Sequence, residues 1–146
     1  MRKKLLMVAA AAAGLFLAAL PALAHHSFAA EYDSNKPVTL RGKITEFEWV
    51  NPHSWVHFDV TDDKGVTANW TAETAPPNIL YRQGWRRDSI KAGDEVIVEG
   101  FAAKDGSHTL SARSVQTPDG RRLFAGSPND GGPGGPSSPG QGSSKK

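Results

Sequence analysis

Short strand-like runs separated by turn signals fill the middle of this sequence and constrain its fold more than any other feature. Apolar and polar residues alternate from position 38 to 60, and turn-forming clusters occur at 62–65, 91–94 and 104–106. Alternation with a period of two is typical of half-buried strands, and clusters of Asp, Lys and Gly are typical of hairpin turns. We therefore expect five strands, at 38–49, 55–60, 66–73, 95–102 and 109–117.

The first of these runs changes phase along its length. Apolar residues occupy even positions as far as Ile44, whereas Phe47 and Trp49 occupy odd positions. A shift by one residue moves a side chain to the opposite face of a sheet, so the change predicts a bulge or a strong bend, which Gly42 would ease.

A single short helix is expected between the third and fourth strands. Thr74 is a suitable N-cap, Pro76 and Pro77 suit a first turn, and Gly84 suits a C-terminal stop. Three strands, a short helix and two strands, with the first strand bent, is the order of a five-stranded Greek-key barrel of the OB type. We expect an all-β domain with one short helix, built as a small OB-like barrel. A small β-sandwich is the alternative, because strand order does not fix closure.

The start of the chain has the pattern of a secretory signal. Arg2, Lys3 and Lys4 precede an apolar stretch from Leu5 to Leu20, and small residues lead to Ala24. The apolar stretch is short for a membrane span, which needs ~20 residues. We expect cleavage after Ala24, no membrane insertion after processing, and a periplasmic or secreted product.

The expected signal peptide at 1–24 and a Gly/Pro/Ser-rich tail at 126–146 leave one domain at 25–125. The tail has no large apolar residue, so it cannot bury enough surface to offset its ordering entropy, and we expect it to be disordered. The sequence has no cysteine, so packing alone must hold the core in an oxidising compartment.

Charge and motifs exclude two classes of function. The sequence has 17 Lys and Arg against 15 Asp and Glu, and three of the cations lie in the expected signal, so 17 − 3 = 14 basic residues remain after cleavage. A chain near neutrality lacks the basic face that nucleic-acid binding requires. The sequence contains no GxSxG, no phosphate-binding glycine loop and no HExxH. We expect neither a nucleic-acid partner nor an enzyme.

Two histidines directly follow the expected cleavage site. Cleavage after Ala24 would place the α-amine of His25 beside its own Nδ1, which makes a bidentate nitrogen chelate. The reference pKa values are about 7.7–8.0 for the amine and about 6.5 for the ring, so a metal displaces few protons near neutrality. A third nitrogen from His53 or His57 would complete the site. Nitrogen-rich tetragonal geometry suits Cu(II), while zinc prefers a tetrahedral set.

Other metal-binding modes remain open at this terminus. His26 can chelate through its ring, the amide nitrogen before it and the terminal amine, and the His25-His26 pair can hold Cu(I) linearly. Asp59 shares a strand face with His57 and can fix the tautomer of that ring by a hydrogen bond. The remaining interpretation is that His25 and His26 bind no metal and stay mobile, because chain termini usually are mobile.

Two tryptophans suggest a function of a different class. Trp49 and Trp55 flank the turn at 51–54 and lie on odd-numbered positions. Exposed aromatic side chains on an OB-type barrel can stack on bases or sugar rings, although they can also simply cover the open end of a small barrel. The alternative to a copper carrier or sequestering protein is therefore a metal-free module that binds a small molecule, a glycan or a partner protein.

Four stretches resemble a family of uncharacterised exported bacterial proteins, a domain of unknown function: AHHSFAAEYD, KPVTLRGKITEFEWVNPHSW, APPNILYRQGW and IKAGDEVIVEGFAAKDGS. Together they span about Ala24 to Ser107. The resemblance implies export and a small β-rich fold, and it implies no particular activity. The expected terminal His25 is also similar to that of copper proteins with a histidine brace, which include oxidative polysaccharide enzymes and periplasmic copper carriers. That second similarity covers one residue and its cleavage context.

Overall fold

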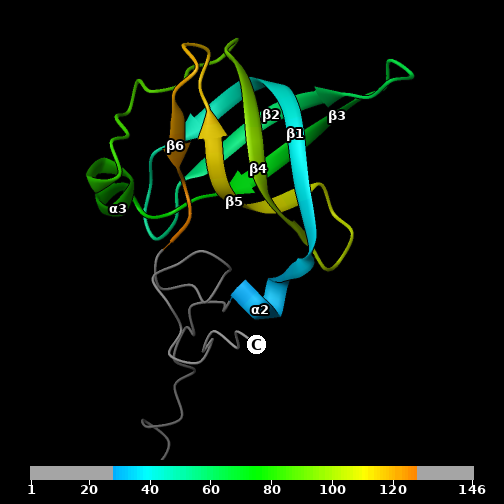
Figure 1. Cartoon of the computed structure of the whole chain (residues 1–146), viewed down its shortest axis with the longest axis horizontal. Coiled ribbons are helices and arrows are strands. Elements are labelled where there is room, and N and C mark those ends of the chain that lie inside the picture. Colours follow the sequence, from blue (N-terminus) through cyan, green and yellow to red (C-terminus); the bar gives the residue numbers. More distant parts are fainter. Residues whose placement is uncertain (1–27, 128–146) are drawn as a thin grey trace, which may run out of the picture.

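The described part of the protein is a β-rich domain with only short helices (Figure 1). A computed structural model describes residues 28–127. Its strands are β1 (Tyr32–Glu48), β2 (Trp55–Thr61), β3 (Thr67–Glu73), β4 (Glu95–Ala103), β5 (Thr109–Gln116) and β6 (Arg122–Phe124). The helices are α2 (Phe28–Glu31) and α3 (Pro77–Arg82). Within these residues, no helix has the length and apolar content needed to cross a membrane.

The strands pair in the order β3-β2-β1-β4-β5-β6, and each pair in that order is antiparallel. A further pairing joins β3 and β5 in parallel, with residues 71–73 beside residues 109–111. Strands β1 to β4 therefore each have two hydrogen-bonded neighbours, and β5 has three, because it also pairs with β6. The expected mostly β architecture is confirmed, and β6 and α2 add to the five strands and one helix that the sequence predicts.

The long strand β1 changes partner along its length, and its register shifts where it pairs with β2. Residues 43–48 pair with β2, and residues 37–43 pair with β4. The shift lies between Ile44 and Glu46, so the expected irregularity is confirmed just beyond Gly42. A Cβ added at Gly42 would lie 2.6 Å from the carbonyl oxygen of Asp59. The glycine is therefore required by the close approach of β2.

One cluster of buried side chains forms the main core between the strands and α3. On β2, Val56 and Phe58 are fully buried, while the intervening residues point to the partly exposed face, as the alternation predicts. Fully burying one such side chain contributes about 1.5–3 kcal/mol. Trp85 follows α3 and is also buried, and its Nε1 donates a hydrogen bond of 2.7 Å to the carbonyl oxygen of Phe124. This bond joins the helical connection to β6.

A second, smaller cluster holds α2 against the ends of β1 and β4. Phe28, Tyr32 and Ala103 are buried together, with Phe101 packed against them. The Phe28 ring lies 5.6 Å from the Phe101 ring in an edge-on arrangement and 5.8 Å from the Tyr32 ring, measured between centroids. The Lys104 amide donates to the carbonyl oxygen at the end of α2 over 2.8 Å. Packing therefore fixes where the chain enters the domain at Phe28.

The start of α3 differs from the expectation. Its N-cap is Pro76, without a side-chain hydrogen bond, and Thr74 is not the cap. Thr74 Oγ1 donates instead to the carbonyl oxygen of Ser54 over 2.9 Å. Pro76 and Pro77 have no N–H, so this helix start has fewer donors that need a cap. The predicted stop is confirmed at Gly84, whose φ of +95° favours glycine.

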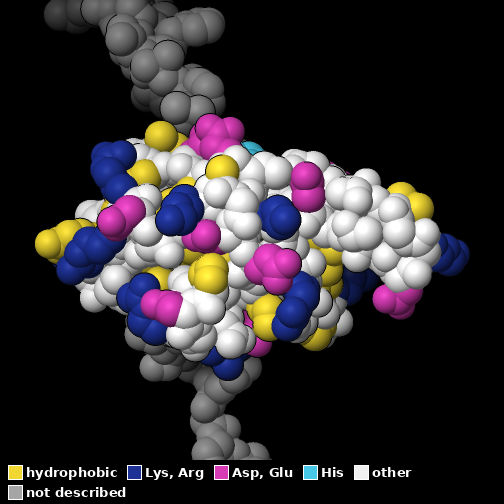
Figure 2. All heavy atoms as spheres, turned by 90° about the horizontal axis from the view of Figure 1, so that it is seen from above, with side chains coloured by type: hydrophobic (Ala, Val, Ile, Leu, Met, Phe, Trp, Pro, Cys, Tyr) yellow, Lys and Arg dark blue, Asp and Glu magenta, His cyan; other side chains and the backbone are white. Residues whose placement is uncertain are grey.

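Acidic and basic side chains alternate over one face of the domain (Figure 2). Over the described residues visible there, neither sign forms a continuous stripe.

The tight contact between β4 and β5 generates a stability prediction. Gly100 lies at a register shift between these strands, and an added Cβ would be 2.1 Å from the carbonyl oxygen of Ser111. Because the obstacle is backbone, the strands must separate to admit a methyl group. We expect Gly100→Ala to lower the free energy of unfolding by about 1–3 kcal/mol in urea denaturation. A loss below about 0.5 kcal/mol, the range of ordinary surface substitutions, would contradict this packing.

Candidate functional site

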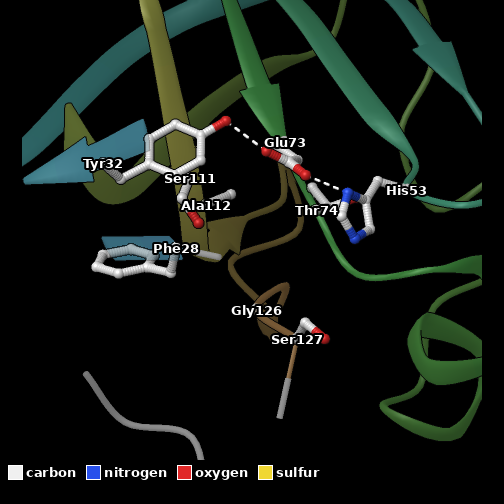
Figure 3. A pocket seen from close by; sticks show the side chains of 9 residues that line it. All are labelled: Phe28, Tyr32, His53, Glu73, Thr74, Ser111, Ala112, Gly126 and Ser127. Atoms are coloured by element: carbon white, nitrogen blue, oxygen red, sulfur yellow. Dashed lines mark hydrogen bonds and ion pairs between the residues drawn. The ribbon is translucent and has the colours of Figure 1, made fainter. Parts of the chain in front are cut away.

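A small pocket lies where the start of α2, the end of β3 and the middle of β5 meet the turn before β2 (Figure 3). It is lined by Phe28, Tyr32, His53, Glu73, Thr74, Ser111, Ala112, Gly126 and Ser127. Its volume is about 20 Å³, which accommodates an occupant the size of a water molecule. The pocket therefore suits a single ion or a very small group.

Glu73 is the carboxylate on which the polar side chains of the pocket converge. Tyr32 donates its O–H to Oε2 of Glu73, and Nδ1 of His53 contacts Oε1. Figure 3 shows the three side chains in a row, with the carboxylate between the phenol and the imidazole. The side chains of Glu73 and His53 are 15% and 24% exposed. Both carboxylate oxygens thus have partners, as a largely buried charge requires.

Backbone hydrogen bonds hold the turn that carries His53 against the end of β3. The Thr74 amide donates to the carbonyl oxygen of Ser54 over 2.9 Å, and the Ser54 amide donates to the carbonyl oxygen of Ala75 over 3.4 Å. Ser54 is fully buried. Because Glu73 is the last residue of β3 and His53 precedes Ser54, these bonds place the two side chains together.

Tyr32 is a fixed donor in this arrangement. Its side chain is buried in the cluster with Phe28. Burial, followed by the hydrogen bond to Glu73 and the charge of that carboxylate, raises the pKa of Tyr32 well above its ordinary value of 10.0. The phenol therefore remains protonated throughout the neutral range and continues to donate to Glu73.

The contact with Glu73 occupies Nδ1 of His53. A neutral ring that donates from Nδ1 carries its lone pair on Nε2. Figure 3 places the second ring nitrogen on the side of the imidazole away from Glu73. Metal-binding histidines usually donate their other N–H to a carboxylate or carbonyl in this way.

His57 has a different environment, although its side chain is similarly exposed, at 23%. Its Nδ1 lies 3.1 Å from Oγ1 of Thr71, and its Nε2 lies 2.9 Å from Oε1 of Glu48. Both ring nitrogens are thus engaged by protein groups. Asp59, the expected partner of this ring, instead accepts a hydrogen bond of 2.8 Å from Asn69.

The structure brings together only part of the expected metal site. His25 and His26 lie outside the described residues. Among residues 28–127, no group of three or more His, Cys, Asp or Glu side chains could hold a metal ion. The described pocket thus contains one of the four expected ligands, His53, and not a complete ligand set.

The two tryptophans of the expected aromatic face have different surroundings. Trp49 packs edge-on against Phe47 at 5.6 Å, with the Arg87 guanidinium 6.0 Å from its ring centroid, and it contacts the main core. Trp55 is partly exposed on β2, where it pairs in register with Glu48 and Glu73. Trp49 therefore contributes to packing, whereas Trp55 lies on the partly exposed face of β2.

Sequence reasoning missed Glu73 and Tyr32. Glu73 has no distinguishing sequence signal, and it meets His53 only because β3 pairs with β2. Tyr32 precedes the expected start of the first strand, in a segment that has no apolar periodicity. The AEYD sequence around it falls in a stretch that the family resemblance covers, and this was the one available signal.

The Tyr32–Glu73 bond predicts how stability depends on pH. We expect Tyr32→Phe to lower the free energy of unfolding by about 1–3 kcal/mol near neutrality, since it removes a donor from a largely buried charge. The folded protein raises the pKa of Tyr32, so its contribution is complete below the unfolded value of 10.0 and declines as the pH rises above it. Chemical denaturation of the wild type and Tyr32→Phe, near neutrality and above pH 10.0, measures the two free energies of unfolding. The difference between them should be smaller at the higher pH. A difference that widened at high pH would contradict this assignment.

Comparison with known proteins yields one match. The model of a family of unknown function (DUF6152) matches residues 12–112, a range that includes Tyr32, His53 and Glu73. No curated protein and no solved structure gives a significant match.

Proposed function

The chain belongs to this family of unknown function, and we propose that it is an exported protein that binds copper as a carrier or sequestering protein. The ligands are the amine and ring of His25 together with Nε2 of His53. The observation that carries the proposal is the His53 ring, held by the Glu73 carboxylate in a pocket of ionic size beside Phe28. His26 is the alternative ligand at the terminus.

Covalent geometry supports the participation of His25. Phe28 lines the pocket together with His53, and His25 precedes Phe28 by three residues. Consecutive Cα atoms are 3.80 Å apart, so the Cα atoms of His25 and Phe28 are separated by about 11 Å at most, whatever the conformation between them. His25 is therefore proposed as a ligand from its place in the sequence, three residues before a residue that lines the pocket.

The available donors favour copper and favour His53 over His57. An amine and two imidazoles form an all-nitrogen set, which suits tetragonal Cu(II) better than tetrahedral zinc. Both nitrogens of His57 already contact Thr71 and Glu48, so a metal would have to displace these groups. His53 lines the pocket beside Phe28, whereas His57 does not.

Export is part of the same proposal, since the α-amine belongs to His25 only after cleavage behind Ala24.

We also propose that the five main strands form an OB-like barrel. The parallel pairing of β3 with β5 supports this architecture, because it gives β3 a second neighbour besides β2.

The rival function, a metal-free module that binds through Trp49 and Trp55, has less support because Trp49 packs against the core.

Titration with Cu(II) tests the proposed site. The wild-type protein is processed in the periplasm, and intact mass confirms that it begins at His25. We expect tight binding of one Cu(II), which one extra residue before His25 abolishes. We expect His53→Gln to weaken binding by at least about tenfold, as even the loss of a supporting group at a metal site does. Isothermal calorimetry or competition with a chromophoric chelator gives the dissociation constants.

His57→Gln is the matched control, because it removes a histidine of similar exposure that also contacts a carboxylate. This variant should bind Cu(II) as tightly as the wild type. Equal binding by the native and extended termini, or no binding by either, would refute the site at His25. Equal losses in the two histidine variants would remove His53 as the specific third ligand.

A further inference from the structure

We propose that a second pocket, formed by β1, β4, β5 and the turn before β6, binds a free α-amino acid with an aliphatic side chain. Among the described residues, this pocket shares no lining residue with the one around Glu73, so the inference does not depend on the proposed copper site. Its volume is about 250 Å³, below that of the clefts of about 300–1,000 Å³ that hold drug-sized ligands. The space therefore suits a molecule of amino-acid size.

Strand register places one wall of the pocket on the outer face of the sheet. Arg41 on β1 is opposite Ile97 on β4, and Ile97 is opposite Gln116 on β5. Residues directly opposite each other share a face, and Glu95 shares it too, because it precedes Ile97 by two positions. The next residue of β4 after Ile97, Val98, points to the other face and is fully buried. Four side chains from three neighbouring strands thus line this wall.

The turn between β5 and β6 supplies another wall and has a fixed shape. Thr117, Pro118 and Gly120 line the pocket, at the end of the sheet where β4 begins (Figure 1). The Thr117 amide donates to the carbonyl oxygen of Arg121 over 2.8 Å, and the Gly120 amide donates to the carbonyl oxygen of Thr117 over 2.9 Å. The side chains of Arg121 and Asp119 pair with each other at 2.6 Å. The charges of the turn are therefore compensated within it.

Two opposite charges face the pocket without contacting each other. Of the described residues that line it, Arg41 and Glu95 are charged. Neither forms an ion pair or a side-chain hydrogen bond with another residue in the range 28–127. Lys43, the register partner of Glu95 on β1, does not line the pocket. A molecule that carries both a carboxylate and an ammonium group can therefore bridge the two side chains through charge-assisted hydrogen bonds.

The lining residues match the separate parts of an amino acid. The Arg41 guanidinium presents the paired donors that suit a carboxylate, and the Glu95 carboxylate accepts from an ammonium group. Ile97 is partly buried and lines the pocket with Pro118, so an aliphatic side chain has apolar surface to contact. The amide of Gln116 can hydrogen-bond with either polar group. Because Arg41 and Glu95 are exposed, we expect a modest affinity.

Titration with L-leucine, followed by amide NMR spectra of the labelled protein, tests the inference because it detects weak binding and locates it. The processed protein is stripped of metal, since amino acids chelate copper. We expect saturable shifts centred on the amides of Ile97, Gln116 and Gly120. Isocaproate is leucine without its ammonium group, and isoamylamine is leucine without its carboxylate. Each should bind about threefold to fivefold more weakly than leucine, the loss expected for one exposed charged contact.

Two substitutions identify the charged contacts. Arg41→Gln and Glu95→Gln should each weaken leucine binding by about threefold to fivefold. Arg41→Gln should not weaken the binding of isoamylamine, and Glu95→Gln should not weaken that of isocaproate. Arg113→Gln and Glu46→Gln are the matched controls, because both residues are exposed and neither lines the pocket. Both controls should bind leucine as the wild type does, and the same spectra confirm that each variant is folded.

Several outcomes would overturn the inference. Leucine that causes no saturable shifts, or shifts centred elsewhere, refutes the site. Isocaproate that binds as tightly as leucine would make Arg41 a site for anions alone, without a role for Glu95. Equal losses in the pocket variants and the controls would show a general effect of surface charge. None of these results bears on the copper proposal, whose ligands lie outside this pocket.

Discussion

The contact of the Glu73 carboxylate with Tyr32 and His53 joins three separate parts of the domain. Tyr32 begins β1 and Glu73 ends β3, 41 positions later in the sequence, and His53 lies in the turn before β2. A carboxylate that is 15% exposed needs partners for both oxygens. The contact of this one carboxylate with Tyr32 and His53 therefore brings both side chains to the same pocket.

The fold supplies the geometry that this contact requires. Antiparallel pairing of β2 with β3 aligns Trp55 with Glu73, and the turn that precedes Trp55 then falls beside the carboxylate. Phe28 and Phe101 pack at the same end of the sheet and hold α2 there.

The sequence predicted those features that depend on local patterns. Alternation along β2 identified the buried faces of Val56 and Phe58, and Gly84 marked the end of α3. Glu73, Tyr32 and the partners of His57 could not be predicted, because their roles depend on strand register and on contacts between distant segments. The four-residue helix α2 could not be predicted either, since it is held by packing and has no periodicity of its own. The sequence offered both His53 and His57 as a third ligand, and the structure distinguishes them because only His53 lines the pocket.

Electron paramagnetic resonance of the processed protein loaded with one Cu(II) tests the central claim most directly, because nitrogen hyperfine structure reports the directly bound nitrogens. The account predicts a tetragonal spectrum with three coupled nitrogens in the wild type and two in His53→Gln. It predicts no change in His57→Gln. A spectrum that is identical in the wild type and His53→Gln would contradict the account, because it would place the metal away from the pocket that Glu73 organises.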